Sequence, residues 1–453
     1  MKPRANRSST SRPAAAKATA AEAGGQSAPQ LVRIEKPVYG GSFLARVEGK
    51  AVFVPMALPG EEARIRLHEE KRGYAIGEAE EIVVASAERV SPACPHFGAC
   101  GGCHYQHAGY EAQLEMKRAV LRETMERAGV VVPGEISVLA NAPWRYRNRI
   151  RLAFDAAGRA GYRGRRSHAV IPVRECPIAA PLLIEAALAF PEVLRRAAPA
   201  LRPTEVTLFC DAAENALLAS VISASAGKTH FDELAQAWHD CVPALRGVEW
   251  MVEGSRGQPS RTVARWGEGS LFYSAAGFGY RVDQGAFFQV NRWLVDALVE
   301  RVTAGRQGEL AWDLFAGVGL FARQLTRNFR RVVAVESAPA ATRALAANLK
   351  GSSGVPVRSA TLEFLRAQSR TSGLQTPNLI VVDPPRTGLG AETCALIAKA
   401  AAPVVVYVSC DPATLSRDLR ALAGSGYAVE SITVVDLFPQ TFHLETLVEL
   451  RHA

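Results

Sequence analysis

The sequence predicts an α/β protein whose carboxyl-terminal third folds around a parallel sheet. From about residue 290 onward, strand-sized apolar runs alternate with helical patterns; the runs cover residues 310–315, 332–335, 379–382 and 404–408. Buried strands that alternate with helices form parallel sheets with crossover helices. The chain also has 453 residues, which is too long for one hydrophobic core. We therefore expect two or three domains.

The composition is that of an ordinary globular protein, with 48% hydrophobic and 21% charged residues. No apolar run reaches the roughly 18 residues of a membrane helix, so no membrane partner is expected. The net charge of +9 favours a polyanionic partner only weakly, because much of the excess lies in residues 1–30. That segment is rich in Ala, Ser and Arg. It predicts a disordered basic tail, with a transit peptide as the alternative.

The chain has eight cysteines, and their expected role depends on the cellular compartment. Because the amino terminus lacks the apolar core of a secretory signal, we expect a cytoplasmic protein. Cysteines there bind metals or catalyse more often than they form disulfides.

Two regions precede the parallel sheet. Residues 31–90 alternate short apolar runs with Gly and Pro turns, which predicts a small β-barrel, with nucleic-acid binding as one option. Residues 111–128 predict a helix, and a mixed α+β region continues to about residue 285. In that region Arg alternates with aromatic and polar residues from Trp144 to Arg149, and Arg163, Arg165 and Arg166 lie nearby in the sequence. Interleaved cations and rings suit single-stranded RNA, although a solvated strand face would look the same.

A cofactor pocket is indicated where the first strand of the parallel sheet ends. The segment from Asp313 to Gly319 leaves that strand through two glycines and enters a helix, so a ligand can approach the backbone closely. The second strand ends in Glu336, at a place where an acidic residue commonly binds a ribose diol. The two features favour an adenosine-type cofactor. They do not separate methyl transfer from hydride transfer.

Two later strands end in residues that could act on a nucleobase. Asp383-Pro384-Pro385-Arg386 forms a stiff corner at the end of one strand, and Cys410 ends the next. A thiolate that adds to carbon 6 of uracil makes carbon 5 nucleophilic toward a methyl group. A base must then remove the proton from carbon 5, and Glu445 is the best-placed candidate.

A third pattern is a cluster of cysteines. Cys94, Cys100 and Cys103 lie within ten residues that also hold three glycines, and Cys176 is the candidate fourth ligand. Thiolate ligands suit an iron–sulfur cluster or zinc, and nearby histidines keep a mixed zinc site open at His96, His104 and His107. The other cysteines have no partner pattern and are expected to be buried apolar residues: Cys210, Cys241 and Cys394.

Over residues 31–453 these motifs resemble the S-adenosylmethionine-dependent RNA uracil-5-methyltransferase family. The most specific are Gly285–Asn291, Asp313–Gly319, Asp383–Arg386, Ser409–Pro412 and His443–Thr446. The resemblance implies a Rossmann-like class I methyltransferase domain over residues 286–453, with a parallel sheet and a reversed last strand. It implies that S-adenosylmethionine is contacted by Gln289, Phe315, Glu336 and Asp383. It further implies Cys410 as the nucleophile, Glu445 as the general base, and a [4Fe–4S] cluster on Cys94, Cys100, Cys103 and Cys176. One departure is Leu320, because the family often has Asn there.

The barrel resembles the OB-like TRAM RNA-binding domain, and the resemblance implies a central RNA-binding domain over residues 91–285. A TRAM barrel joined to a cysteine cluster is most similar to the family's 23S ribosomal RNA enzymes, since its transfer-RNA enzyme generally lacks both. We therefore expect a monomer that methylates a uridine in 23S rRNA. The alternatives are a transfer-RNA enzyme and a noncatalytic iron–sulfur RNA-binding or assembly protein. Cytosine is disfavoured because the Pro-Pro corner lacks an additional cysteine.

Overall fold

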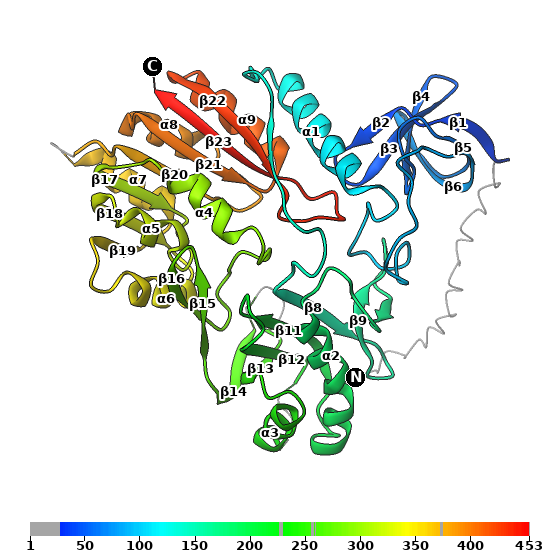
Figure 1. Cartoon of the computed structure of the whole chain (residues 1–453), viewed down its shortest axis with the longest axis horizontal. Helices are drawn as coiled ribbons and strands as arrows, with labels where there is room; N and C mark the ends of the chain where they lie inside the picture. Colours follow the sequence, from blue (N-terminus) through cyan, green and yellow to red (C-terminus); the bar gives the residue numbers. More distant parts are fainter. Residues whose placement is uncertain (1–27, 226–229, 255–257, 259, 372–374, 453) are drawn as a thin grey trace, which may run out of the picture.

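The computed structural model describes residues 28–225, 230–254, 258, 260–371 and 375–452. Residues 1–27 of the predicted basic tail lie outside the described residues. Within the described part of the chain, no helix is long and apolar enough to cross a membrane. The chain folds into a small all-β unit, a central α+β unit and a large α/β unit (Figure 1).

The amino-terminal unit is a six-stranded sheet with the order β1-β5-β6-β4-β3-β2. Its strands are β1 (Gln30–Arg33), β2 (Lys36–Val38), β3 (Ser42–Val47), β4 (Lys50–Pro55), β5 (Glu62–Glu70) and β6 (Tyr74–Val84). Alternate residues along the strands point inward, so that Phe43, Val52 and Ile65 are fully buried in one small core. The predicted small all-β unit is present, with strands that run from Gln30 to Val84.

The central unit is a seven-stranded sheet with helices on one face, in the order β10-β9-β8-β11-β12-β13-β14. Its elements are β8 (Arg149–Phe154), β9 (Ala160–Arg163), β10 (Val170–Pro172), α2 (Pro181–Ala197), β11 (Pro203–Cys210), β12 (Leu217–Ser223), α3 (Phe231–Cys241), β13 (Leu245–Val252) and β14 (Arg261–Gly267). A hairpin of β15 (Ser270–Ala275) and β16 (Phe278–Asp283) leads into the α/β unit and packs on its core.

The carboxyl-terminal unit is an eight-stranded sheet with the order β19-β18-β17-β20-β21-β23-β22-β7. Its elements are α4 (Val295–Thr303), β17 (Gly308–Leu314), α5 (Leu320–Leu325), β18 (Phe329–Glu336), α6 (Pro339–Leu349), β19 (Gly354–Arg358), α7 (Thr361–Arg370), β20 (Leu379–Val382), α8 (Ala391–Ala400), β21 (Val404–Ser409), α9 (Pro412–Ala423), β22 (Tyr427–Val435) and β23 (Glu445–His452). β19 to β21 are parallel, and β23 runs antiparallel to both of its neighbours. The predicted parallel sheet with a reversed last strand is confirmed.

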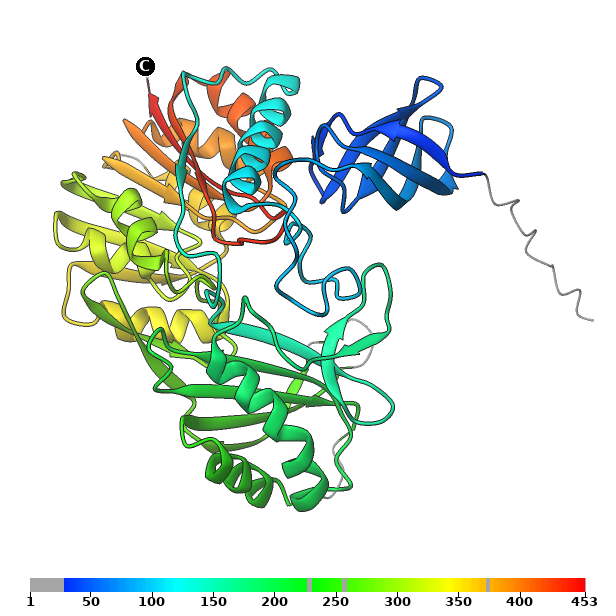
Figure 2. The same ribbon diagram turned by 45° about the vertical axis from the view of Figure 1, so that its right-hand side comes forward.

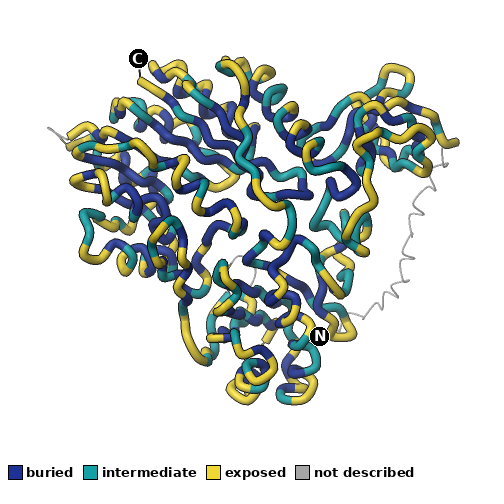
Figure 3. The backbone as a smooth tube through the Cα atoms, viewed as in Figure 1, coloured by how far each residue is buried: buried dark blue, intermediate teal, exposed yellow. Residues whose placement is uncertain are grey.

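Both faces of this sheet are covered, as near-continuous apolar strands require. The residues of β20 are buried on either side, and Figure 3 shows the strands of the sheet as its most buried segments. The strand order reverses between β17 and β20, because the chain proceeds from β17 toward one edge and from β20 toward the other. Ligands of open α/β sheets bind at such a reversal, beyond the carboxyl ends of the strands.

Two early segments join the large sheet although they precede the central unit in the sequence. β7 (Ser137–Leu139) pairs in parallel with β22, and α1 (Tyr110–Arg127) packs beside α9 (Figure 2). The helix predicted over residues 111–128 is therefore present within one residue at each end. Its apolar face, with Val120 and Leu121, closes the core of the large sheet rather than that of the central unit.

One expectation from the sequence was wrong, and the basic–aromatic stretch is enclosed only in part. Tyr146 is fully buried and its hydroxyl donates to the Pro439 carbonyl, whereas Arg145 is exposed. Arg149 is also enclosed, with its guanidinium 4.3 Å from the centre of the Phe209 ring. Cys241 is exposed rather than buried, since it is the last residue of α3 and lies past the helix positions that pack on the core.

Candidate active site and cysteine cluster

The carboxyl edge of the large sheet gathers the candidate catalytic residues from separate strands. Asp383 follows β20 and Cys410 follows β21. Because β23 runs antiparallel to β21, its first residues lie beside the last residues of β21, and Ser409 pairs with Thr446. This register brings Glu445, the first residue of β23, to the same edge as Cys410. Sequence separation alone could not reveal that proximity.

The acidic side chains at this edge are shielded from water. Glu445 is only 6% exposed, and burial, followed by the charge of Asp383, raises its pKa well above the ordinary value. Burial also raises the pKa of Asp383. Two neighbouring carboxyl groups in a protected site cannot both ionise freely, so one of them is a strong proton acceptor.

The Cys410 thiol is half-buried at the same edge. Burial raises its pKa to about 11, the charges of Glu445 and Asp383 add to the rise, and Arg386 opposes it. The thiol is therefore mostly protonated at neutral pH in the free protein. Asp411 caps α9 by accepting bonds from the backbone amides of Ala413 (3.1 Å) and Thr414 (2.9 Å). This cap fixes the segment that carries Cys410.

Arg386 is hydrogen-bonded to a neutral imidazole. Its Nη2 lies 3.1 Å from Nδ1 of His443, and burial, with the nearby Arg386 charge, lowers the pKa of His443 to about 3. A neutral Nδ1 can accept this hydrogen bond. His443 therefore links the Asp-Pro-Pro-Arg corner to the loop that precedes Glu445.

The turn after β17 has the geometry of a small-molecule pocket. Phe315, Gly317 and Gly319 all have positive φ values, of 67°, 57° and 91°. A Cβ at Gly317 would meet nothing within 4 Å, whereas one at Gly319 would lie 2.7 Å from Leu345 Cδ1. The first glycine thus borders open space and the second allows α5 to pack on α6.

Two acidic residues, Glu336 and Asp313, lie at this turn. Glu336 at the end of β18 accepts a 2.9 Å bond from the Gly317 amide, so the carboxylate stands at the mouth of the turn. Asp313 is buried, and one of its carboxylate oxygens has no partner among the described residues. Burial raises its pKa to about 7. A buried acceptor without a partner is costly and is left open for a ligand donor.

Gln289 is brought to this pocket from a different segment, the one that follows β16. Its amide nitrogen lies 3.4 Å from Asp383 Oδ2, and the side chain is 8% exposed. Phe287, two residues earlier, is 59% exposed, while Phe288 between them packs in the core. Leu320 is also buried, so its side chain offers the pocket no polar contact.

The four candidate cluster cysteines converge from two segments. Two hydrogen bonds hold the cysteine loop against the central unit. The Gly101 amide donates to the Arg163 carbonyl (3.0 Å), and the Arg174 amide, two residues before Cys176, donates to the His96 side chain at Nε2 (3.2 Å). The thiols lie close enough to affect one another electrostatically. Burial raises the pKa of Cys103 to about 12, and its neighbours Cys176, Cys100 and Cys94 contribute to the rise.

The described residues contain no group of three or more His, Cys, Asp or Glu side chains spaced to hold a single metal ion. The three histidines near the cysteines are not gathered with them in such a group. His107 is hydrogen-bonded to the Ala57 carbonyl (3.0 Å), and burial lowers the pKa of His104 to about 4. Cys94, Cys100, Cys103 and Cys176 form no disulfide among the described residues, and each is partly buried.

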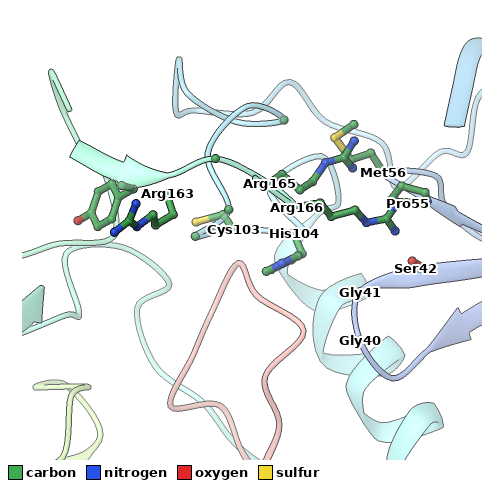
Figure 4. A pocket seen from close by; sticks show the side chains of 15 residues that line it. Gly40, Gly41, Ser42, Pro55, Met56, Cys103, His104, Arg163, Arg165 and Arg166 are labelled. Carbon is green, nitrogen blue, oxygen red and sulfur yellow. The ribbon is translucent and has the colours of Figure 1, made fainter. Parts of the chain in front are cut away.

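A cavity of about 440 Å³ lies between the barrel, the cysteine loop and the central unit. Figure 4 shows Arg165 and Arg166 close to Pro55 and Met56 of the barrel, with Arg163 farther away at the left of the view. Arg165 donates to Glu78 at 2.8 Å. Three arginines thus line the cavity, one of them paired with a carboxylate of the barrel. The sequence contained these arginines but gave no sign that the barrel would face them.

Comparison with known proteins identifies the family. A sequence profile described as tRNA (uracil-5-)-methyltransferase matches residues 268–453, and a TRAM domain profile matches residues 28–79. The chain is 34% identical to a 23S rRNA (uracil(1939)-C(5))-methyltransferase from Halomonas elongata, over 95% of this chain and 91% of that one. An RNA methyltransferase of Thermotoga maritima is 30% identical over 93% of this chain and 98% of that one.

A solved structure with the same fold is the Pyrococcus abyssi tRNA (uracil-54, C5)-methyltransferase in complex with S-adenosyl-L-homocysteine. The TM-score is 0.73 at 22% identity, over 93% of this chain and all of that one. The identity to the H. elongata enzyme along nearly the whole chain decides the assignment. The chain belongs to the TRAM-containing family of S-adenosylmethionine-dependent RNA (uracil-5-)-methyltransferases.

Proposed function

We propose that this enzyme methylates carbon 5 of a uridine in 23S ribosomal RNA. The observation that carries the proposal is the 34% identity to a 23S rRNA uracil-C5 enzyme over 95% of the chain. A transfer-RNA substrate is the second candidate, because the matching profile and the P. abyssi structure bear transfer-RNA names. The cationic cavity beside the barrel is compatible with either RNA.

We propose a covalent mechanism in which Cys410 and Glu445 act in sequence. The Cys410 thiolate forms a bond to carbon 6 of uracil, and the electron pair of the 5,6 double bond moves to make carbon 5 nucleophilic. After carbon 5 has gained the methyl group, Glu445 removes its proton, and the returning electron pair expels the Cys410 thiolate. The register that pairs Ser409 with Thr446 supports these roles, because it brings both residues to one edge.

S-adenosylmethionine supplies the electrophilic methyl group when it is bound. We propose that Gln289, Phe315, Glu336 and Asp383 hold it. The open space at Gly317 and the unpartnered oxygen of Asp313 support a ligand at this turn. Asp383 follows β20, which lies between β17 and β21 in the sheet, and Gln289 contacts Asp383, so both residues are suited to orient the methyl group toward the base. Phe287, exposed next to Gln289, offers a ring on which a base can stack.

We further propose that Cys94, Cys100, Cys103 and Cys176 bind a [4Fe–4S] cluster. Its role would be structural, since the chemistry at carbon 5 needs no redox step. The anaerobically purified protein should be brown and contain about four iron and four sulfide per chain. The Cys100→Ser variant should lose both, while Cys241→Ser should keep them. A colourless wild-type protein with stoichiometric zinc would contradict the assignment.

The RNA target is tested by mapping 5-methyluridine in cells that lack this protein. Mass spectrometry of nuclease fragments should show the loss of one 5-methyluridine from 23S rRNA and unchanged modification of transfer RNA. Expression of the wild-type chain should restore this 5-methyluridine. Loss from transfer RNA alone would favour the second candidate. Residence in the cytoplasm and a monomeric state stay predictions.

A further inference from the structure

One residue of the RNA-binding barrel touches the segment that carries the nucleophile. Tyr39, in the turn between β2 and β3, donates a hydrogen bond from its hydroxyl to Asp411 Oδ2 at 3.3 Å. The other oxygen of this carboxylate caps α9, and Asp411 directly follows Cys410. The barrel thus contributes to the hydrogen bonding around the active-site cysteine.

The same turn packs on the segment that carries the base. The Tyr39 ring meets the Phe442 ring edge-on, with centroids 5.7 Å apart, and Phe442 packs on His443 at 4.4 Å. Gly41 lies so close that a Cβ there would be 3.0 Å from Phe442 Cδ1. It would also stand 3.2 Å from the His104 ring. Only a residue without a side chain fits this contact unaltered.

The barrel is fixed in place against the large sheet. Lys36 in β2 pairs with Glu123 of α1 at 2.7 Å, and α1 packs on α9 of the catalytic unit (Figure 1). The Tyr39–Gly41 turn is therefore held at the catalytic edge by contacts on both sides.

We propose that the Tyr39–Gly41 turn of the barrel positions Cys410 and Glu445 for the reaction, in addition to any part that the barrel plays in binding RNA. The proposal rests on the mechanism proposed above. Tyr39 acts through its hydrogen bond to Asp411. Gly41 acts because its lack of a side chain leaves space for the Phe442 ring. Both are positioning residues, because neither touches a reacting atom.

The proposal has a physical basis, because covalent catalysis tolerates only small errors in the position of the nucleophile. The Cys410 sulfur must approach carbon 6 at a defined distance and angle, and a misplacement of about 1 Å can lower the rate by about 100-fold. Without the Tyr39 hydroxyl, Asp411 keeps its cap to α9 but loses the bond that fixes its other oxygen. The carboxylate and the neighbouring Cys410 then sample a wider range of positions.

The first test separates kcat from KM in the full-length enzyme. Tyr39→Phe should lower kcat about tenfold at saturating S-adenosylmethionine, with KM for an rRNA fragment and the unfolding temperature unchanged. The matched control is Tyr74→Phe, which makes the same change on β6 of the barrel, where Tyr74 packs against Phe53. A raised KM with unchanged kcat in Tyr39→Phe would mean that the barrel only binds RNA, and would overturn the proposal.

A second pair of variants tests the close contact between Gly41 and Phe442. Gly41→Ala should lower kcat, because the added methyl group displaces Phe442. Gly49→Ala is its control, since Gly49 lies in the next turn of the barrel, has a similar φ of 81° against 85°, and has nothing within 4 Å of an added Cβ. Both changes strain the backbone to a similar degree. Equal kcat values in the two variants would therefore overturn the proposal that the contact between Gly41 and Phe442 positions Glu445.

A covalent trap distinguishes failure of this proposal from failure of the mechanism. With RNA that contains 5-fluorouridine, the wild type and Tyr74→Phe should form an adduct, and Tyr39→Phe should form it about tenfold more slowly. If the wild type forms none, the covalent mechanism itself is wrong. If the wild type and Tyr39→Phe react at the same rate, only the positioning role is wrong.

Discussion

Lys117, in α1, forms a buried ion pair with Asp436, the residue that follows β22 and lies 319 positions later in the chain. Lys117 is 2% exposed and Asp436 is 1% exposed. The ammonium group also donates to the Phe438 carbonyl at 2.9 Å, and Tyr110 donates to the second carboxylate oxygen at 2.8 Å. An early helix thereby holds the loop that leads to Glu445.

Removal of the cation should be strongly destabilising. In Lys117→Met the Asp436 carboxylate stays buried without its charged partner, so the free energy of unfolding should fall by about 3–5 kcal/mol. Urea denaturation measures this fall. The control is Arg366→Met, which breaks the exposed pair with Glu392 and should change the free energy far less, because solvent screens that pair. Equal losses of unfolding free energy in the two variants would contradict the view that burial makes the Lys117–Asp436 pair critical for stability.

Cys410→Ala should abolish methyl transfer and leave cofactor binding intact. Cys410 follows β21, which β20 separates from β17 and the Gly317 turn, so the dissociation constant for S-adenosylmethionine should change less than about twofold. Calorimetry and transfer of a labelled methyl group measure the two properties. Cys241→Ala, which alters the exposed cysteine of α3, should have full activity. Activity in Cys410→Ala would eliminate it as the nucleophile.

Glu445→Gln should stop the reaction after the methyl group has been transferred. The amide cannot take the proton from carbon 5, so the thiolate cannot leave, and the enzyme should stay bound to ordinary uridine RNA. A band that resists denaturation on a gel and carries the labelled methyl group detects this complex. Glu430→Gln on the exposed side of β22 should turn over normally. Release of methylated RNA by Glu445→Gln at the wild-type rate would exclude Glu445 as the base.

The reactivity of Cys410 in the free enzyme should increase with pH. Its pKa is raised to about 11, so the thiol form dominates below that pH, and each unit of pH should increase the thiolate fraction about tenfold. Alkylation by iodoacetamide, followed on the Cys410 peptide by mass spectrometry, should therefore accelerate about tenfold from pH 7 to pH 8.

Two variants should shift this alkylation rate in opposite directions. Asp383→Asn removes a negative charge that raises the thiol pKa, so alkylation at pH 8 should become faster. Arg386→Gln removes the positive charge that lowers it, so alkylation should become slower. A rate that does not depend on pH, or shifts of the same sign, would contradict this electrostatic description.

Local patterns were sufficient to predict much of the fold. The apolar runs at residues 379–382 and 404–408 correspond to β20 and β21 because buried parallel strands need apolar residues on both faces. The turn at Gly317 and Gly319 could be predicted from its spacing, since positive φ values favour glycine. The strands of the barrel could also be predicted, because apolar and polar residues alternate along them.

Contacts between distant segments could not be predicted in this way. Tyr146 has the sequence context of an RNA-contacting ring, yet it is buried because the Pro439 carbonyl, far along the chain, accepts its hydroxyl. β7 has only three residues and belongs to the large sheet only through its pairing with β22. The contact of Tyr39 with Asp411 depends on how the barrel docks, which no local pattern encodes.

The most direct test of the central claim is the site of the covalent bond to RNA. The enzyme, S-adenosylmethionine and an rRNA fragment with 5-fluorouridine at the target position are incubated, and the trapped complex is digested and sequenced by mass spectrometry. The covalent mechanism predicts one modified peptide, in which a methylated fluorouracil is bonded to Cys410. Attachment to another residue, or methylation of ordinary uridine by the wild type without any trapped complex, would contradict it.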